Sequence, residues 1–173
     1  MAIIKTLNGK TPSLGKDCFV AETAVIIGDV VTGDNCSIWY NAVLRGDVHY
    51  IRIGHKVNIQ DGVVIHGTYG KSPTNIGNNV SIGHQATVHG CTIGDNVLIG
   101  MNAVVLDDAV VEPNSIIAAG AVVTKGTRVE SGSVYGGIPA RKIGEISPEL
   151  FEGEIRRIAD AYIKYASWYQ KEE

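Results

Sequence analysis

Cysteine, net charge and long apolar runs are all scarce in this sequence, and each scarcity excludes a class of protein. The chain of 173 residues has 3 cysteines, an odd number without CxxC spacing, so neither a disulfide framework nor a cysteine zinc site is indicated. A net charge of -3 and the lack of a Lys/Arg cluster argue against nucleic-acid binding. The longest uncharged apolar runs, such as residues 118–124, fall far short of the roughly 20 residues of a membrane-spanning helix.

The N-terminal ten residues also lack the apolar core of a secretory signal, so we expect a cytoplasmic protein that does not enter a membrane. With 45% hydrophobic and 19% charged residues, the chain is long enough for one domain with its own core.

What the sequence does have is an apolar residue at every sixth position. Ile76, Ile82 and Val88 show the spacing most clearly, and a small or β-branched residue comes four positions after most members of the series. Two inward residues in six, with Gly, Asp and Asn between them, indicate short strands joined by sharp turns, because a helical period of 3.6 cannot sustain this pattern. The apolar series is Leu14, Val20, Ile26, Ile38, Leu44, Ile53, Ile59, Ile65, Ile76, Ile82, Val88, Ile93, Ile99, Val105, Val111, Ile117, Val123 and Val129, and the small series includes Cys18, Ala24, Val30, Cys36, Ala42 and Val48.

Three such strands make one triangular coil, so the chain returns above itself after roughly 18 residues and the coils stack at the sheet spacing of about 4.8 Å. The pattern therefore predicts an all-β solenoid, a parallel β-helix of about six coils. The pattern argues against a doubly wound sheet, because no helix-length segment separates the strands before residue 147. Cys18 and Cys36 fall one coil apart and should stack inside the prism.

The repeat fails after Val134, and we expect two parts: a β-helix over residues 1–135, and an irregular segment with a C-terminal helix over residues 136–173. Gly136, Gly137 and Pro139 break the pattern. Ser147, followed by a proline, looks like an N-cap, and a helix should run from there to about Gln170. Its apolar stripe, which we expect to pack on the solenoid or on a neighbouring subunit, is Phe151, Ile155, Ile158, Tyr162, Ala166 and Tyr169.

Three of the five histidines have defined places in the coils. His66 directly follows Ile65, and His89 directly follows Val88, so the two should stand on one face in adjacent coils. Arg45 has the equivalent place one coil below His66. On the next column, His84 should lie one coil above Asp61, which is preceded by Gln60. His49 and His55 fall outside these columns, and we interpret them as surface residues.

These three histidines predict a metal site between subunits. A corner separates the two columns, so the three rings should not reach one ion within a single chain, where metal–nitrogen distances are about 2.0–2.1 Å. A threefold axis would bring His66 and His89 of one subunit to His84 of the next and make three sites per homotrimer. Three neutral imidazoles with an open fourth position suit a catalytic zinc ion, although iron or cobalt would also fit.

Several short motifs carry a resemblance to a known family. The sequences LRGD at 44–47, NIQD at 58–61, IH at 65–66 and HQATVHG at 84–90 resemble those of the γ-class carbonic anhydrases, a branch of the hexapeptide-repeat transferase superfamily. The resemblance spans almost the whole chain. It implies a left-handed β-helix, a trimer, and hydration of CO₂ to bicarbonate by hydroxide generated at zinc.

The resemblance also implies roles for individual residues. His66, His84 and His89 would be the zinc ligands, and Gln60 would lie near the metal-bound water. Further positions matching the family are Asn58, as a hydrogen-bond donor behind the ligands, and Arg45, pairing across the subunit interface with Asp61 or Asp47. Apart from the resemblance, we expect Tyr162 to approach the site from the last helix.

Two departures from the family pattern favour a slow or inactive hydratase. Val48 follows Asp47 where the archaeal prototype has a glutamate, and residues 67–75 lack the acidic loop that supplies that prototype's proton-shuttle glutamate. Two other functions stay open. One is an acyltransferase that uses acyl-CoA with a histidine as general base, because residues 137–141, GIPAR, resemble a loop of such enzymes. The other is a metal-binding trimer without catalytic activity.

Overall fold

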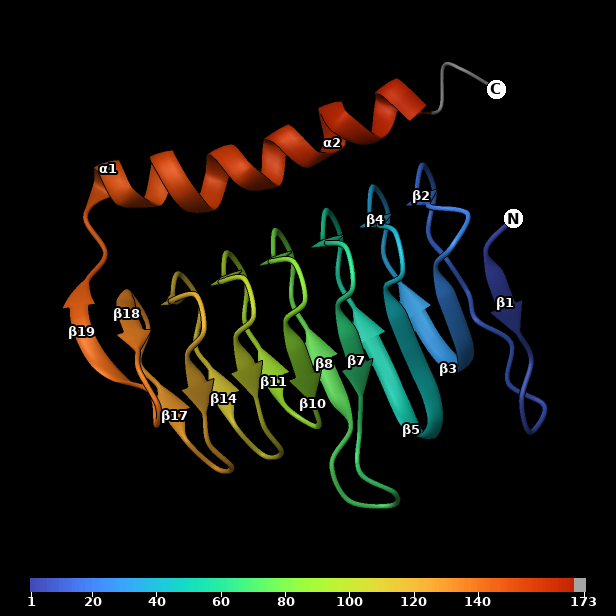
Figure 1. Cartoon of the computed structure of the whole chain (residues 1–173), viewed down its shortest axis with the longest axis horizontal. Helices are drawn as coiled ribbons and strands as arrows, with labels where there is room; N and C mark the ends of the chain where they lie inside the picture. Colours follow the sequence, from blue (N-terminus) through green and yellow to red (C-terminus); the bar gives the residue numbers. More distant parts are fainter. Residues whose placement is uncertain (170–173) are drawn as a thin grey trace.

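The computed structural model describes residues 1–169 and shows a left-handed parallel β-helix with a helix running along one side (Figure 1). One face of the solenoid is an eight-stranded sheet, in which seven strands are parallel and the last strand, β19, is antiparallel. Each parallel strand belongs to one coil, so the solenoid has seven coils, one more than the six predicted. The strands are β1 (Ile3–Lys5), β2 (Phe19–Val20), β3 (Val25–Thr32), β4 (Ser37–Ile38), β5 (Val43–Ile53), β6 (Asn58–Ile59), β7 (Val64–His66), β8 (Thr74–Ile76), β9 (Ser81–Ile82), β10 (Thr87–His89), β11 (Thr92–Ile93), β12 (Leu98–Ile99), β13 (Val104–Val105), β14 (Val110–Val111), β15 (Ile116–Ile117), β16 (Val122–Val123), β17 (Arg128–Val129), β18 (Ser133–Gly136) and β19 (Arg141–Glu145).

The predicted columns of apolar residues are confirmed by the strand register. Leu44 pairs with Ile65, Ile65 with Val88, and Val88 with Val105, while a second column pairs Ile59 with Ile82. These side chains are fully buried. Because full burial of such a side chain contributes about 1.5–3 kcal/mol, the stacked columns are the main source of the fold's stability.

The predicted series of small and β-branched inward residues breaks at Val48, which is half-buried and does not point into the core. Its expected place is taken by Ile51, which pairs with Val30 and is fully buried. The register shifts here, so that residues 47–50 of β5 lie opposite Asp29 alone. Such a bulge turns side chains out of the regular alternation, and it projects Asp47 from the surface of the coil.

At one corner of each coil, the backbone takes a left-handed conformation that asparagine tolerates better than most residues. Asn79, Asn96 and Asn114 have φ values of 54°, 55° and 58°. Their side chains form a ladder, in which Asn79 Nδ2 donates to Asn96 Oδ1 at 3.2 Å and Asn96 Nδ2 donates to Asn114 Oδ1 at 3.0 Å. The asparagines therefore serve both the turn and the contact between coils.

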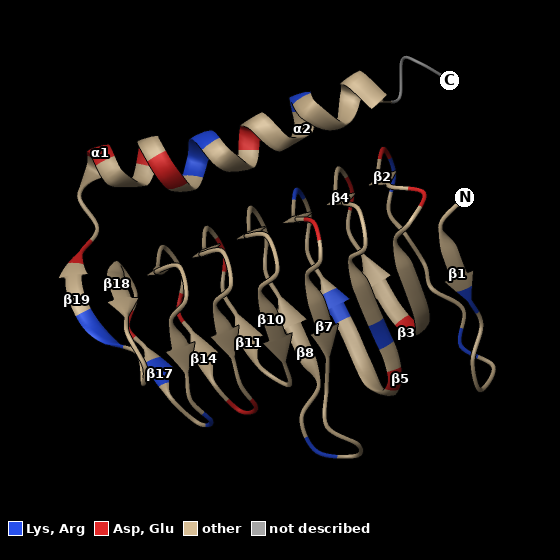
Figure 2. Cartoon of the chain, in the orientation of Figure 1, with Lys and Arg blue, Asp and Glu red and all other residues tan. Residues whose placement is uncertain are grey.

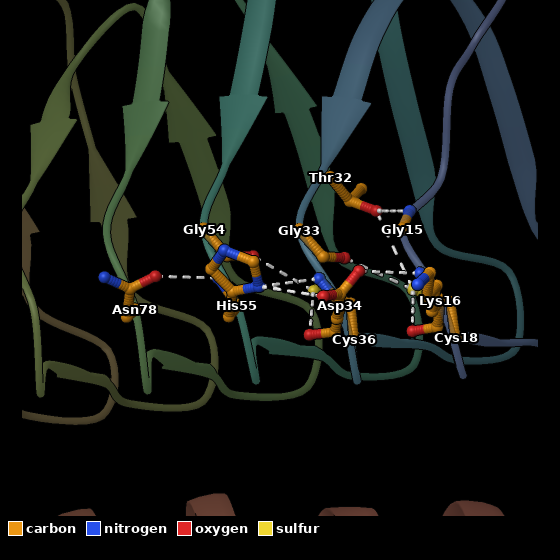
Figure 3. A network of polar contacts seen from close by, with 10 residues as sticks. All are labelled: Gly15, Lys16, Cys18, Thr32, Gly33, Asp34, Cys36, Gly54, His55 and Asn78. Carbon is orange, nitrogen blue, oxygen red and sulfur yellow. Dashed lines mark hydrogen bonds and ion pairs between the residues drawn. The ribbon is translucent and has the colours of Figure 1, made fainter.

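Cys18 and Cys36 lie at the same corner in the first two coils, as predicted, and both are free thiols (Figure 3). Cys36 is buried, with Sγ 3.1 Å from the Gly54 carbonyl oxygen, and the half-buried Cys18 has Sγ 3.4 Å from that of Gly33. His55 lies beside them on the surface, where its Nδ1 accepts a hydrogen bond from the Asp34 N–H at 2.9 Å.

The last coil ends in a β-hairpin where an irregular segment was predicted. β18 pairs antiparallel with β19, and the turn between them contains a cis peptide bond between Ile138 and Pro139. The prediction of an irregular segment was wrong here, because Gly136, Gly137 and Pro139 lie at the turn of a hairpin whose two strands are regular. The hairpin covers the edge of the last coil, which would otherwise expose unpaired backbone groups.

The C-terminal helix begins where predicted and returns along the solenoid towards the first coils (Figure 1). Ser147 is the N-cap, its Oγ accepting from the Leu150 N–H at 3.2 Å. The helix has three parts, α1 (Pro148–Leu150), a π-helical stretch η1 (Phe151–Arg156) and α2 (Arg157–Tyr169). Ile155, Ala159 and Ala166 are its buried residues. Its predicted end at Gln170 lies outside the described residues.

The first turns of this helix carry acidic residues and the following turns carry both signs (Figure 2). Ion pairs such as Arg156 with Glu152 at 2.9 Å join them. Within residues 1–169, no helix is both long and apolar enough to cross a membrane.

Candidate metal centre

His66 and His89 lie side by side at the ends of β7 and β10, as the coil register predicts. The two residues are paired in the parallel ladder, and His66 Nδ1 lies 3.1 Å from His89 Nε2. Their side chains are 15% and 29% exposed, so both rings lie at the surface of the coil with one edge open. Two nitrogens that ligate one tetrahedral ion lie about 3.3 Å apart, so the pair fits two positions of such an ion.

A carboxylate holds the outer nitrogen of each ring. Asp47 Oδ1 lies 2.8 Å from His66 Nε2, and Asp107 Oδ1 lies 2.6 Å from His89 Nδ1. Partial burial alone would raise the pKa of Asp47, but hydrogen bonds from Arg45 and His66 outweigh burial and lower this pKa below its usual value. The pKa of Asp107 is lowered in the same way, by Thr68 and His89 against the effect of burial. Both groups are therefore carboxylates at neutral pH.

Arg45 contacts Asp47 within its own chain. Its Nη1 donates to Asp47 Oδ2 at 2.6 Å, while the other oxygen of Asp47 faces His66. Of the two acids predicted for Arg45, Asp47 is its partner within the chain, on the same strand. The pairing of Arg45 across a subunit interface stays a prediction. Asp61, the other acid, contacts a different histidine.

His84 lies on the neighbouring column, one coil above Asp61, as predicted. Its Nδ1 is 2.8 Å from Asp61 Oδ2, and its side chain is 39% exposed. Gln60 and Asn58 are buried beneath it. Gln60 Oε1 accepts from the His84 N–H at 3.2 Å, Gln60 Nε2 donates to Asn58 Oδ1 at 3.0 Å, and Asn58 Nδ2 donates to Ser81 Oγ at 2.7 Å. This chain of amides fixes the backbone that carries His84.

One chain does not bring the three histidines together. Among residues 1–169, no three His, Cys, Asp or Glu side chains converge as ligands of a metal ion. The single chain therefore carries a pair of histidines on one face and one histidine on the next, which agrees with the expectation that the corner keeps them apart.

Comparisons with known proteins place this chain in a family. Residues 73–107 and 90–125 match the bacterial transferase hexapeptide (six repeats) model. A probable carbonic anhydrase of Methanocaldococcus jannaschii is 53% identical over 152 residues, which cover 88% of this chain and 92% of that protein. The chain belongs to the γ-class carbonic anhydrase family. The mitochondrial gamma carbonic anhydrase 2 of Arabidopsis thaliana is 44% identical over 168 residues, covering 94% of this chain and 60% of that protein.

A solved structure extends the likeness to a protein with a different name. The hexapeptide transferase family protein from Anaplasma phagocytophilum is 40% identical, with a TM-score of 0.92, and the match covers 96% of this chain and 98% of that one. The γ-class carbonic anhydrase fold is thus common to proteins described as anhydrases and as transferases.

Tyr162 of α2 lies near the His84 side of this γ-class chain. It lines a cavity together with Asp61. Burial, with the negative charge of Asp61 as a further cause, raises the pKa of Tyr162 to about 12. Its phenol therefore stays protonated at neutral pH and can donate a hydrogen bond but cannot act as a base.

Sequence reasoning missed Asp107, Thr68 and Gly90. Asp107 lies two positions beyond Val105, one coil after His89, and an inspection of acids in the histidine column would have found it. Thr68 Oγ1 donates to Asp107 Oδ2 at 2.7 Å, a contact across 39 residues that no period indicates. Gly90 has φ of 57°, and a β-carbon there would lie 2.2 Å from Asp107 Oδ1, so only glycine leaves that carboxylate in contact with His89.

Proposed function

We propose that the protein is a γ-type carbonic anhydrase that hydrates CO₂ to bicarbonate at metal sites shared between the subunits of a homotrimer. The observation that carries the proposal is the pair of ring nitrogens, His66 Nδ1 and His89 Nε2, 3.1 Å apart. A carboxylate accepts hydrogen bonds but cannot donate them, so Asp47 and Asp107 keep the imidazole protons on the outer nitrogens. In neutral rings, two lone pairs then face each other, an arrangement that a metal ion accepting both of them would stabilise.

His84 would supply the third imidazole from a neighbouring subunit. Three observations support this arrangement. The chain belongs to the carbonic anhydrase family, His84 lies at the surface, and no third ligand lies beside His66 and His89 within residues 1–169. Three imidazoles suit zinc, and iron or cobalt could occupy the same set. When bound, such an ion lowers the pKa of a coordinated water and so supplies a nucleophile near neutral pH.

The chain's own residues would position the site. Asp47 and Asp107 fix the tautomer and tilt of the histidine pair, and Arg45 holds Asp47 from the other side. The Gln60 amide, anchored by Asn58, fixes the backbone of His84 and lies beneath it as the candidate group to orient the attacking water or CO₂. Proton removal is the weak step, because residues 67–75 carry no acid, and we expect slow turnover.

Mixing two inactive variants tests whether the site is shared. His84→Ala removes the ligand of one face and His89→Ala removes a ligand of the other, so neither homotrimer should hold the ion. When equal amounts of the two variants mix at random, about a quarter of the interfaces join an intact His84 to an intact His66–His89 pair, so about a quarter of the wild-type metal content should return. Metal analysis of the co-expressed protein reads this directly. If mixing restores no metal, or if either variant alone retains it, the shared site is wrong.

Stopped-flow CO₂ hydration then separates an enzyme from a metal-binding trimer. The zinc-loaded wild type should exceed the His89→Ala variant at equal protein concentration. If the wild type holds its metal but hydrates CO₂ no faster than the His89→Ala variant, the protein is a metal-binding trimer without hydratase activity.

An acyl-CoA-dependent transferase is the second candidate, and the likeness to the Anaplasma phagocytophilum hexapeptide transferase family protein favours it. A transferase with a histidine base needs no metal. Acyl transfer from acetyl-CoA that survives removal of the ion would therefore support this candidate over the anhydrase.

A further inference from the structure

The last turns of α2 and the early coils form a cavity that is open to solvent. Because the helix runs back along the solenoid, its last turns lie over β4 and β2 (Figure 1). The cavity has a volume of about 370 Å³, within the range of small-molecule sites. Six aromatic side chains line it, and we call it the aromatic pocket: Trp39, Tyr40, Tyr162, Tyr165, Trp168 and Tyr169.

The rings of the aromatic pocket stand at steep angles to one another and pack edge to face, so that each ring holds its neighbour in place. The Trp39 ring meets the Tyr162 ring at 83° and the Tyr169 ring at 84°, with centroids 5.3 Å and 5.5 Å apart. The Tyr165 ring continues from Tyr162 at 66°. Trp39 is itself fixed, because its Nε1 donates to Ser37 Oγ at 3.0 Å and its side chain is 6% exposed.

The electrostatics of the aromatic pocket favour a positive ligand. Among the described residues that line it, Asp61 alone carries a formal charge. The face of an aromatic ring carries negative partial charge and attracts cations, most strongly in tryptophan. One cation of the chain already uses this attraction, since Lys164 Nζ lies 6.0 Å from the centroid of the Trp168 ring.

We propose that the aromatic pocket binds a small organic cation of the quaternary ammonium class. A primary ammonium group needs three hydrogen-bond acceptors when it leaves water, and ring faces supply few. A quaternary ammonium has no N–H to satisfy and presents methyl groups to the rings while its charge is balanced by Asp61. Multiple ring walls around one cation are the arrangement by which proteins recognise such ligands.

The proposal stands apart from the proposed anhydrase activity, although Asp61 also contacts His84. All residues of the aromatic pocket come from one chain, whereas the proposed metal site needs two. Cation binding can therefore be measured on the full chain after the metal has been removed. Failure of cation binding would then leave the metal site untouched, and failure of the metal site would leave cation binding measurable.

The two tryptophans of the chain, Trp39 and Trp168, both line the aromatic pocket, so tryptophan fluorescence reports on it alone. Choline should produce a saturable change, and its neutral isostere 3,3-dimethylbutan-1-ol should bind at least about tenfold more weakly, because it has the same shape without the charge. Calorimetry with both compounds checks the affinities independently. Equal affinity for the two would show a merely apolar pocket, and no saturable binding by either method would overturn the proposal.

Variants locate the binding. Trp168 is 51% exposed, so replacing it should not disturb the core. Trp168→Leu should weaken choline binding about tenfold, whereas Trp168→Phe, which keeps a ring, should retain most of it, with Trp39 as the remaining reporter. Asp61→Asn should weaken choline binding without changing that of the neutral isostere. Unchanged choline affinity in Trp168→Leu would place the cation elsewhere and contradict the proposal.

Discussion

Each ring of the His66–His89 pair uses one nitrogen for a carboxylate and presents the other to its neighbour. This arrangement decides the tautomer, since an ionised carboxylate cannot donate. A carboxylate behind a ligating imidazole also makes that imidazole a stronger base and holds its plane. Asp47 and Asp107 therefore matter to the proposed metal site although neither is a ligand in it.

Asp107→Asn should lower metal affinity about 10–100-fold, because an uncharged amide is a weaker partner for the His89 N–H. Competition with a chelator of known affinity measures the change. Asp108→Asn is the matched control: the same charge is removed one position later, where the carboxylate takes a hydrogen bond from Ser72 Oγ at 2.7 Å and pairs with Lys125. Equal losses in the two variants would show a general charge effect and contradict the role of Asp107.

The thiols of the chain should differ in reactivity. Hydrogen bonding with Cys36 lowers the pKa of the half-buried Cys18 to about 6, whereas burial raises the pKa of Cys91 to about 12. The reactive thiolate of Cys18 should form as pH rises through its pKa and be present at pH 7, where Cys91 remains a thiol.

Iodoacetamide followed by peptide mapping should therefore label Cys18 first at pH 7, with a rate that falls towards pH 5. Cys18→Ser should abolish the early labelling. Labelling of Cys91 at the same rate would contradict both the burial and the direction of the shifts.

At the scale of elements, the corners connect local backbone conformation to stacking. The ladder of Asn79, Asn96 and Asn114 satisfies side-chain amides between coils at positions where the backbone is left-handed. A β-branched residue would be strained there, and an alanine would accept the conformation at a cost of about 1–2 kcal/mol.

A pair of substitutions at Asn96 separates these two contributions. Asn96→Gly removes the side-chain hydrogen bonds but keeps the backbone conformation accessible, and Asn96→Ala removes the same bonds and adds strain. The free energy of unfolding, measured by urea denaturation, should fall further in the alanine variant, by about 1 kcal/mol. If both variants lose the same amount, strain at this corner is not significant.

At the scale of the whole molecule, the proposed metal ion would join subunits as well as supply chemistry. A ligand bound at 100 times its dissociation constant stabilises the folded state by about 2.7 kcal/mol, and here the bound state is the trimer. Removing the ion should therefore weaken the association of the trimer and lower the free energy of unfolding together. Each chain should still fold, because its seven coils have their own core.

A chelator should lower the melting temperature of the wild type, and the shift should grow on dilution, as read by calorimetry and light scattering at two protein concentrations. His84→Ala provides the control, because its sites are already incomplete and the chelator should change nothing. A shift of the same size in His84→Ala would show that the chelator acts elsewhere.

The sequence by itself determined the coils, their columns of buried residues, and the alignment of His66 with His89 and of His84 with Asp61. A fixed period of six with parallel stacking converts sequence position directly into spatial position, so these relations need no knowledge of side-chain contacts. The trimer and the three-histidine ion site stay predictions that rest on the same periodicity.

Only the tertiary structure decided which groups face the histidines and where the helix lies. The bulge at residues 47–50 falls outside the period, and it is this bulge that turns Asp47 towards His66. The helix has an apolar stripe of its own, but its packing partner, and hence the aromatic pocket at Trp39, depends on contacts between residues far apart in sequence. Such contacts follow from the shapes of the packed surfaces, and no local pattern encodes them.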